Sequence, residues 1–504
     1  MKSLLVVSAA AAALAAHPAL AADLPVKAPV KAPLPIYNWS GFYIGANAGV
    51  SAGVTPIVQT TAFPPFPPDV VNTSTHDPFG AIGGLQAGYN LQSSNWVLGI
   101  EGDVQLSGQR SDPTCLSFCS FNFQSPANVQ FDSVNQRIPW FATLRGRIGF
   151  TSGPLLFYGT AGGAFADIHT SFSTTNVVHL SAEASDQRAG LAVGGGIEAA
   201  LTGNWTAKVE YLYLDYGVVT DNFTPPGFPS PLTVVSGRVV DHVARAGVNY
   251  RFGAPVPVAT AGLMPTKARP ITPAVYDWNG IYIGGNLGYS VGRDAAHEDI
   301  FGLFGNGSQR FMLVPRGAVG GAQVGYNYVP TPWLLLGVEA DYQLADQRNT
   351  ACFTWCIATS GSSTYSQSLD WFATARGRAG VVAGPALFYA TAGGSWTKVS
   401  TTGTQVNTLT AGGVTTFFTS TGSFSDQRTG WAVGGGIEGA IGAGWTAKVE
   451  YLYLDFGTIT NLFPSTGFNL ADPNVHISTN IRDNVFRGGL NYHFLPWDVV
   501  KAKY

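Results

Sequence analysis

The sequence predicts an all-β protein built from two tandem eight-stranded antiparallel transmembrane β-barrels. Three observations predict this fold: a long repeat that divides the chain in two, runs of alternating apolar and polar residues, and connections that are alternately short and long. After the N-terminal 22 residues, no stretch of about 18 apolar residues could form a membrane-spanning helix. Barrel strands need only alternating hydrophobicity, so a β-barrel remains possible.

Two copies of one pattern make up most of the chain. The segment Trp205-Thr-Ala-Lys-Val-Glu-Tyr-Leu-Tyr-Leu-Asp215 recurs unchanged at 445–455, and Ala192-Val-Gly-Gly-Gly-Ile-Glu198 recurs at 432–438. This period is far too long for a solenoid repeat, so each copy is a domain. The predicted boundaries are a signal peptide at 1–22, a Pro-rich periplasmic spacer at 23–37, barrel repeat 1 at 38–252, a Pro-rich linker at 253–276, barrel repeat 2 at 277–494 and a C-terminal tail at 495–504.

Eight segments of the first copy have the character of strands. In one of them Ile100 and Val104 share a face, while Glu101 and Asp103 share the other, as a period of two requires. The predicted strands are 39–51, 80–91, 96–107, 137–150, 155–166, 187–201, 205–216 and 242–252.

The seventh predicted strand departs from this alternation. Leu212 and Leu214 fall on the same face as Lys208 and Glu210, so apolar and charged residues share one side. A β-bulge, or an exit of the strand above the membrane, would explain the departure.

Connection lengths indicate which way the barrels are oriented. The short ones lie at 92–95, 151–154 and 202–204, whereas those at 52–79, 108–136, 167–186 and 217–241 are long and polar or Pro-rich. Strict alternation of short and long connections is typical of periplasmic turns and extracellular loops. Aromatic residues at the predicted periplasmic ends, Trp39, Trp96, Trp205 and Phe252 among them, are expected to form a membrane-interface girdle.

The N-terminus and the composition indicate export. Lys2, an apolar run at 4–16 and Ala19-Leu20-Ala21 predict a secretory signal cleaved after Ala21 or Ala22. A membrane anchor is the alternative, which the short apolar run disfavours. Charged residues are 11% of the chain and the formal net charge is −3, so nothing suggests a nucleic-acid partner. We expect the protein in the outer membrane of a Gram-negative bacterium.

The predicted register points charges of both signs into each lumen. In so narrow an interior they should form ion-paired, hydrogen-bonded networks, and an eight-stranded barrel leaves room for side chains but for no water-filled pore. Glu101 with Asp103 could suggest acid–base chemistry, but interior salt bridging explains the pair better. The expected network residues are Glu101, Asp103, Arg145, Arg147, Arg188, Glu198, Lys208, Glu210 and Arg245 in the first copy, and Glu339, Asp341, Arg376, Arg378, Arg428, Glu438, Lys448, Glu450 and Arg487 in the second.

The four cysteines form two close pairs. Cys115 and Cys119 lie in the first copy, and Cys352 and Cys356 in the second. After export, such pairs most simply form local disulfides. A metal or redox site is the alternative, but C-x-x-x-C is not the redox C-x-x-C motif and no pair of His accompanies either pair.

As a set, three motifs resemble a known family. They are the opening Trp39-Ser-Gly-Phe-Tyr-Ile-Gly45, the repeated strand at 205–215 and the closing Gly247-Val-Asn-Tyr-Arg-Phe252. They are similar to small alphaproteobacterial outer-membrane barrels, the RopB-like, OmpA-type group. The resemblance implies insertion by the barrel-assembly machinery and roles in envelope integrity and surface interaction. Members of that group usually carry one barrel and end on an aromatic closing strand, whereas this chain carries two barrels and continues past Phe494.

The predicted function is structural: envelope integrity and surface interaction, through outer-membrane lipid and unidentified extracellular ligands of the loops. The alternative is a porin-like passive channel, formed if both copies merge into one sixteen-stranded barrel. The linker at 253–276 favours two barrels, because a merged sheet would need only a short turn. We expect no enzyme, no cofactor and no metal site, since no nucleophile–base set or ligand motif is recognisable.

Overall fold

The protein is described here from a computed structural model. It describes residues 37–63, 66–112, 114–117, 132–174, 180–224, 233–252, 276–302, 305–357, 361–411, 414–464 and 474–494. The predicted signal peptide, most of the spacer and of the linker, and the tail lie outside these residues. Within them the regular structure is entirely β-strand, and no helix there is long and apolar enough to cross a membrane.

Among the described residues, ten strands come from each copy. In the first copy they are β1 (Gly41–Phe63), β2 (Phe66–His76), β3 (Phe79–Ser93), β4 (Trp96–Arg110), β5 (Thr114–Ser117), β6 (Asp132–Ser152), β7 (Leu155–Thr174), β8 (Leu180–Ala200), β9 (Trp205–Phe223) and β10 (Thr233–Arg251). In the second copy they are β11 (Gly280–Gly292), β12 (Asp294–Gly302), β13 (Gly305–Leu313), β14 (Arg316–Thr331), β15 (Leu334–Ile357), β16 (Gly361–Ala383), β17 (Ala386–Ala411), β18 (Val414–Gly442), β19 (Trp445–Pro464) and β20 (Asn474–His493).

Each copy closes into its own antiparallel ring. In barrel 1 the order is β1-β3-β4-β6-β7-β8-β9-β10, and β10 pairs back onto β1. In barrel 2 it is β11-β14-β15-β16-β17-β18-β19-β20, and β20 pairs back onto β11. The prediction of two eight-stranded barrels is therefore confirmed. The merged sixteen-stranded alternative does not fit this pairing, because closure within each copy leaves no strand edge to join the rings.

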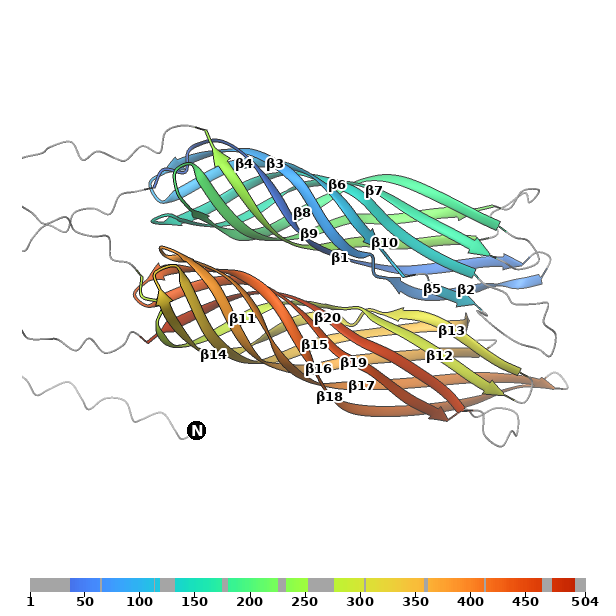
Figure 1. Ribbon diagram of the computed structural model, residues 1–504. Coiled ribbons are helices and arrows are strands. Elements are labelled where there is room, and N and C mark those ends of the chain that lie inside the picture. Colours follow the sequence, from blue (N-terminus) through green and yellow to red (C-terminus); the bar gives the residue numbers. More distant parts are fainter. Residues whose placement is uncertain are drawn as a thin grey trace, which may run out of the picture.

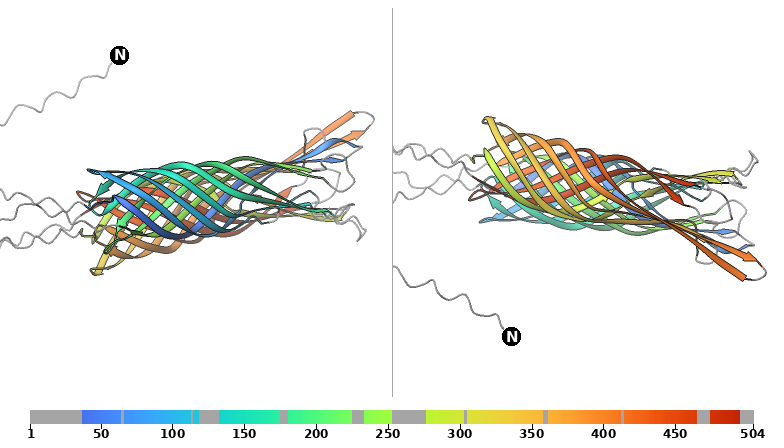
Figure 2. Two further views of the ribbon diagram at one scale, coloured as in Figure 1. Left: turned by 90° about the horizontal axis from the view of Figure 1, so that it is seen from above. Right: turned by 90° about the horizontal axis from the view of Figure 1, so that it is seen from below.

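The two barrels lie side by side with the same orientation, barrel 1 in blue to green and barrel 2 in yellow to red (Figures 1 and 2). Short strands β2, β5, β12 and β13 extend the rings at the end that carries the long connections. At that end β2 of barrel 1 packs against β15 of barrel 2, and the two strands form a single β-bridge, between Thr73 and Cys352.

The exposed band around the barrels is apolar, as lipid contact requires. Leu85, Leu106 and Leu287 are 71%, 73% and 76% exposed, whereas Glu101 and Asp103, on the same strand as Leu106, are buried. Such an apolar surface is unfavourable in water but favourable in contact with the hydrocarbon of a lipid bilayer. The outward row of β8 includes Leu191, which is 66% exposed, and Ile197, which is covered by barrel 2 rather than by a soluble core.

Several predicted loops turn out to be strand. β1 continues to Phe63 and β8 begins at Leu180, so the sheet extends past the apolar band. Pairing there persists because neighbouring strands continue together, even though their side chains are polar. Low hydrophobicity in these stretches indicates exit from the membrane, not loss of strand structure.

The break in alternation on β9 has a different cause from the two that we expected. A bulge is present, but it follows at Tyr216–Gly217, where Gly217 has φ of +75°. Leu212 and Leu214 are fully buried inside barrel 1, above the charged residues on the same face. The alternation is intact, and the lumen itself changes from ionic to apolar along its length.

Candidate functional site: the filled lumens and the contact between barrels

Strand register brings opposite charges directly across from one another inside each barrel. In barrel 1, Glu101 pairs in register with Arg145, Lys208 with Glu198, and Arg245 with Glu210. In barrel 2 the corresponding register pairs are Glu339 with Arg376, Lys448 with Glu438, and Arg487 with Glu450. Cross-strand opposition of this kind stabilises the register of an antiparallel sheet.

Arg145 lies at the centre of the network of barrel 1. Its guanidinium donates from Nη2 to Glu101 Oε1 at 2.8 Å and to Asp103 Oδ2 at 2.9 Å, and from Nη1 to Glu210 Oε1 at 3.0 Å. Its side chain has no solvent exposure. One arginine therefore links carboxylates of two strands that do not pair with each other, β4 and β9.

The other three cations complete the network of barrel 1. Arg245 reaches Asp103 at 2.9 Å and Glu210 at 2.6 Å. Lys208 donates to Glu101 at 2.7 Å. The fourth cation is Arg147, whose Nη2 donates to Glu198 Oε2 at 2.7 Å.

The charges balance within the ionic network of each barrel. Four buried carboxylates face four buried cations in barrel 1, and the same arrangement recurs in barrel 2 with nearly equal distances. The members in barrel 2 are Glu339, Asp341, Glu438, Glu450, Arg376, Arg378, Lys448 and Arg487. Buried charges are tolerated only when they are paired and hydrogen-bonded, which these are.

Uncharged residues that the sequence analysis did not single out complete the site. Tyr43 donates to Glu101 at 2.7 Å, and Thr143 donates to Asp103 at 2.6 Å. The Arg147 guanidinium lies 4.3 Å from the ring centroid of Tyr158. The internal repeat could have indicated these three residues, because their equivalents in the second copy, Tyr282, Thr374 and Tyr389, occupy the same inward positions.

Two predicted members lie apart from the networks. Arg188 is about one-third exposed and pairs with Asp186 at 3.2 Å, toward the outer mouth of barrel 1. Arg428 donates to the carbonyl of Thr458 at 2.9 Å near the outer end of barrel 2. Both side chains point inward, but each lies beyond the apolar layer. Alternation along the strand gives the face on which a side chain lies, but not its position along the barrel axis.

Apolar layers close each lumen above and below the network. Phe141, Leu212 and Leu214 pack inside barrel 1 above the charges. Trp39 packs with Val97 and Leu156 at the periplasmic end. Trp39 is fully buried, so it plugs the lumen and does not belong to the lipid-facing girdle, where Trp96 (56% exposed) does lie.

Among the described residues, no group of three or more His, Cys, Asp or Glu side chains is placed to hold a metal ion. Cys352 is disulfide-bonded. The predicted pairs Cys115 with Cys119 and Cys352 with Cys356 involve side chains outside the described residues, so the pairing stays a prediction.

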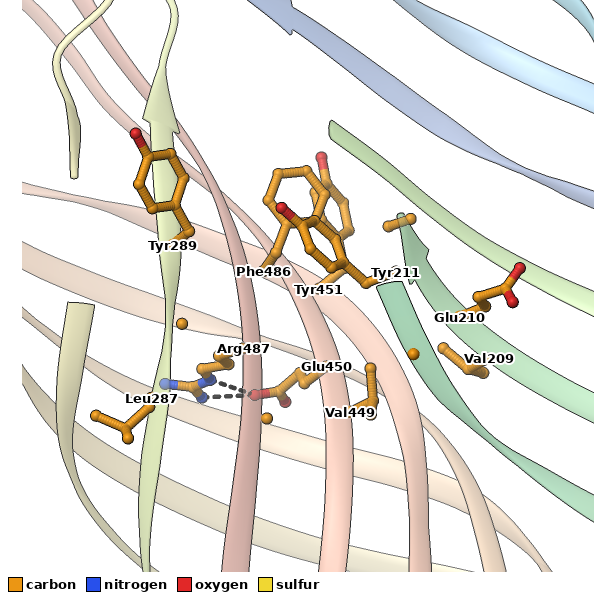
Figure 3. Close-up of a pocket in the computed structure, with 14 residues that line it drawn as sticks. Val209, Glu210, Tyr211, Leu287, Tyr289, Val449, Glu450, Tyr451, Phe486 and Arg487 are labelled. Atoms are coloured by element: carbon orange, nitrogen blue, oxygen red, sulfur yellow. Dashed lines mark hydrogen bonds and ion pairs between the residues drawn. The ribbon is translucent and has the colours of Figure 1, made fainter. Parts of the chain in front are cut away.

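The barrels contact each other through outward-facing side chains. Tyr211 of barrel 1 lies 5.2 Å, ring centroid to ring centroid, from Phe486 of barrel 2, and His242 stacks on Tyr289 at 5.2 Å. A cavity of about 330 Å³ lies between them, and Leu287 is among its lining residues. Figure 3 shows the rings of Tyr211, Tyr289 and Phe486 among the residues that line the cavity, with Arg487 and Glu450 paired to each other.

Comparison with known proteins matches both copies to one family model. The model described as "Outer membrane protein beta-barrel domain" matches residues 4–252 and 258–494. The 31 kDa outer-membrane immunogenic protein of Brucella melitensis is 33% identical over 262 residues, covering 50% of this chain and 100% of that protein. The 22 kDa outer membrane protein of Rhizobium leguminosarum is 31% identical over 196 residues, covering 39% and 70%.

Solved structures also resemble the chain. Neisserial surface protein A is 15% identical, with a TM-score of 0.21, and the match covers 42% of this chain and 98% of that one. The Pseudomonas putida toluene transporter TodX is 10% identical, with a TM-score of 0.24, and the match covers 90% of each chain.

Proposed function

Because the chain belongs to the outer membrane protein β-barrel domain family, and is thus an integral outer-membrane protein, we propose that it has a structural and surface-interaction role. In this proposal it is a sealed pair of barrels, neither a channel nor an enzyme. It contacts outer-membrane lipid along its apolar band, and the barrel-assembly machinery inserts it.

The filling of the lumens carries this proposal. The guanidinium groups of Arg145 and Arg245 occupy the width of barrel 1 with no solvent exposure, and Trp39 and Phe141 pack below and above them. An eight-stranded ring is only wide enough for its own side chains. Every carboxylate of the two ionic networks is engaged by cations, so none of these is free to act as a general acid or base.

The surface-interaction part rests on the strands that leave the membrane. β17 and β18 are the longest strands, and their hairpin, in orange, extends furthest beyond the barrels in Figure 2. Its described outer part is rich in Thr, Ser and Gly, and the Thr402 and Ser423 hydroxyls are hydrogen-bonded at 3.1 Å. Polar, regular projections of this kind present a surface to the exterior.

Planar-bilayer recording tests the sealed-barrel proposal. Folded full-length protein is expected to give no large, stable conductance steps, because neither lumen has room for a water column. A matched variant that shortens the plug in both barrels, Trp39→Ala with Trp278→Ala, shows whether the assay detects loosened lumens. Large, stable pores from the unaltered protein would reject the structural role in favour of a channel.

A further inference from the structure

The two barrels meet through equivalent faces, related by an approximate two-fold axis. Two equivalent hydrogen bonds fix the correspondence of the outer ends: Gly53 N–H to Pro78 O and Gly292 N–H to Pro315 O, both 2.7 Å. Val54, which follows Gly53, therefore corresponds to Arg293, and Asp77, which precedes Pro78, corresponds to Val314. In such a symmetric pairing every contact has a counterpart on the other side of the axis.

One contact and its counterpart have opposite chemistry. Arg293 Nε lies 2.6 Å from Asp77 Oδ2, and Asp77 is 2% exposed. Across the axis, the counterparts Val54 and Val314 pack in one apolar cluster and are 3% and 0% exposed. An ion pair on one side is thus replaced by a valine pair on the other.

Deeper contacts also differ between the copies. His242 stacks on Tyr289, whereas their counterparts are Asn484 and Val50; Phe486, which contacts Tyr211, corresponds to Ala244.

The periplasmic end shows the same complementarity of shape. A Cβ on Gly439 would come within 3.0 Å of Leu155 Cδ1, so the glycine makes room for the leucine. Their counterparts, Ala199 and Ala386, are both small and lie in the same cluster.

We infer that the two copies have diverged into complementary halves, so that each barrel selects the other and rejects a second barrel of its own kind. Two first-copy barrels would place the Asp77 carboxylate against Val54 at both contacts. Two second-copy barrels would place Arg293 against Val314. Either pairing buries charges without partners, and such repulsive elements give interfaces their specificity.

The test uses the full-length chain with a protease site inserted in the linker at 253–275 and cut only after folding. The symmetrised variant Arg293→Val with Val314→Asp gives the second copy the residues of the first at these two positions. At pH 8 in mild detergent, under reducing conditions, the apparent dissociation constant of its cut halves is expected to rise about 30-fold or more over wild type.

Two matched variants complete the experiment. The transposed variant, Val54→Arg and Asp77→Val together with Arg293→Val and Val314→Asp, rebuilds both pairs with sides exchanged. It loses only the 3.3 Å contact of Arg293 with the exposed Asp112, so the dissociation constant of its cut halves is expected to stay within about threefold of wild type. The control Arg348→Val removes an exposed arginine that pairs with Asp346 on its own strand, and is expected to change nothing. Gel mobility before heating shows that every half is folded.

Three outcomes would overturn the inference. In the first, the cut halves of the symmetrised variant stay associated with the wild-type dissociation constant. In the second, the cut halves of the transposed variant separate. In the third, the cut halves of the wild-type protein separate. The first would mean that these residues do not select the partner. The second would mean that the positions are not equivalent, and the third that no stable contact exists. None of these results bears on whether the lumens conduct.

Discussion

Arg145 contacts three carboxylates, so the loss of its side chain leaves the buried network one cation short, with four carboxylates facing the three remaining cations. It is fully buried and lies between strands that are not neighbours in the ring. Removing one member of a buried ion pair costs far more than the pair itself contributes, because the remaining charge has neither water nor a partner.

We expect Arg145→Met to lower the free energy of unfolding of barrel 1 by about 3–5 kcal/mol. The matched control is Arg188→Met, where a partly exposed arginine pairs with Asp186, and a change within about 0.5 kcal/mol is expected. Urea titration of the folded protein in detergent micelles measures both. Equal effects of the two substitutions would contradict the central position of Arg145.

Asp77 gives the protein a pH-dependent contribution outside the membrane. Burial raises the pKa of Asp77 to about 7, although Arg293 opposes the shift. An unfolded chain has a pKa of about 3.9 at an aspartate, so the folded state holds the proton more tightly. This residue therefore favours folding at low pH, and that contribution is lost as the pH rises from about 4 through about 7.

We expect Asp77→Asn to flatten this part of the stability profile. Unfolding titrations at pH 5 and pH 8 should show a larger decrease for wild type than for the variant over the same interval. A wild-type profile parallel to that of the asparagine variant would contradict the raised pKa.

At the scale of elements, β4 illustrates how one strand serves two environments. Ile100, 53% exposed, faces the lipid, while Glu101 beside it is buried in the ionic network. β9 adds a second feature, because its inward face changes from charged to apolar at Leu212. The sheet positions both layers because each residue on a strand alternates in direction and advances along the barrel.

We expect Ile100→Arg to destabilise barrel 1 by about 2–4 kcal/mol, since it places a charge in the hydrocarbon region. Leu91→Arg, at the periplasmic end of β3, is the matched substitution, and about 0–1 kcal/mol is expected there. Unfolding in lipid vesicles measures the difference. If Leu91→Arg proved the more damaging, our placement of the apolar band would be wrong.

The whole molecule consists of two rings that each satisfy their backbone hydrogen bonds internally. Closure leaves no unpaired edge in the membrane, which is the condition for a stable barrel in lipid. Folded protein is therefore expected to resist SDS until it is heated, and then to shift in gel mobility. Identical migration before and after heating would be incompatible with closed barrels.

The sequence by itself determined the membrane β-barrel class, the division into two copies and the inward direction of the charges. These follow from period-two alternation and from a repeat, and both are local properties of the chain. Arg145 and Glu101 could be placed on inner faces because each alternates with apolar neighbours on its own strand.

Only the tertiary structure decided ring closure, depth and partner choice. Alternation along a strand gives the direction of a side chain but not its position along the barrel axis. The sequence therefore could not show that Arg188 and Arg428 lie outside the ionic networks, or that Trp39 lies outside the aromatic girdle. Whether β10 returns to β1 is a matter of long-range hydrogen bonding. The pairing of Arg293 with Asp77 depends on two surfaces meeting, and neither strand pattern contains that information.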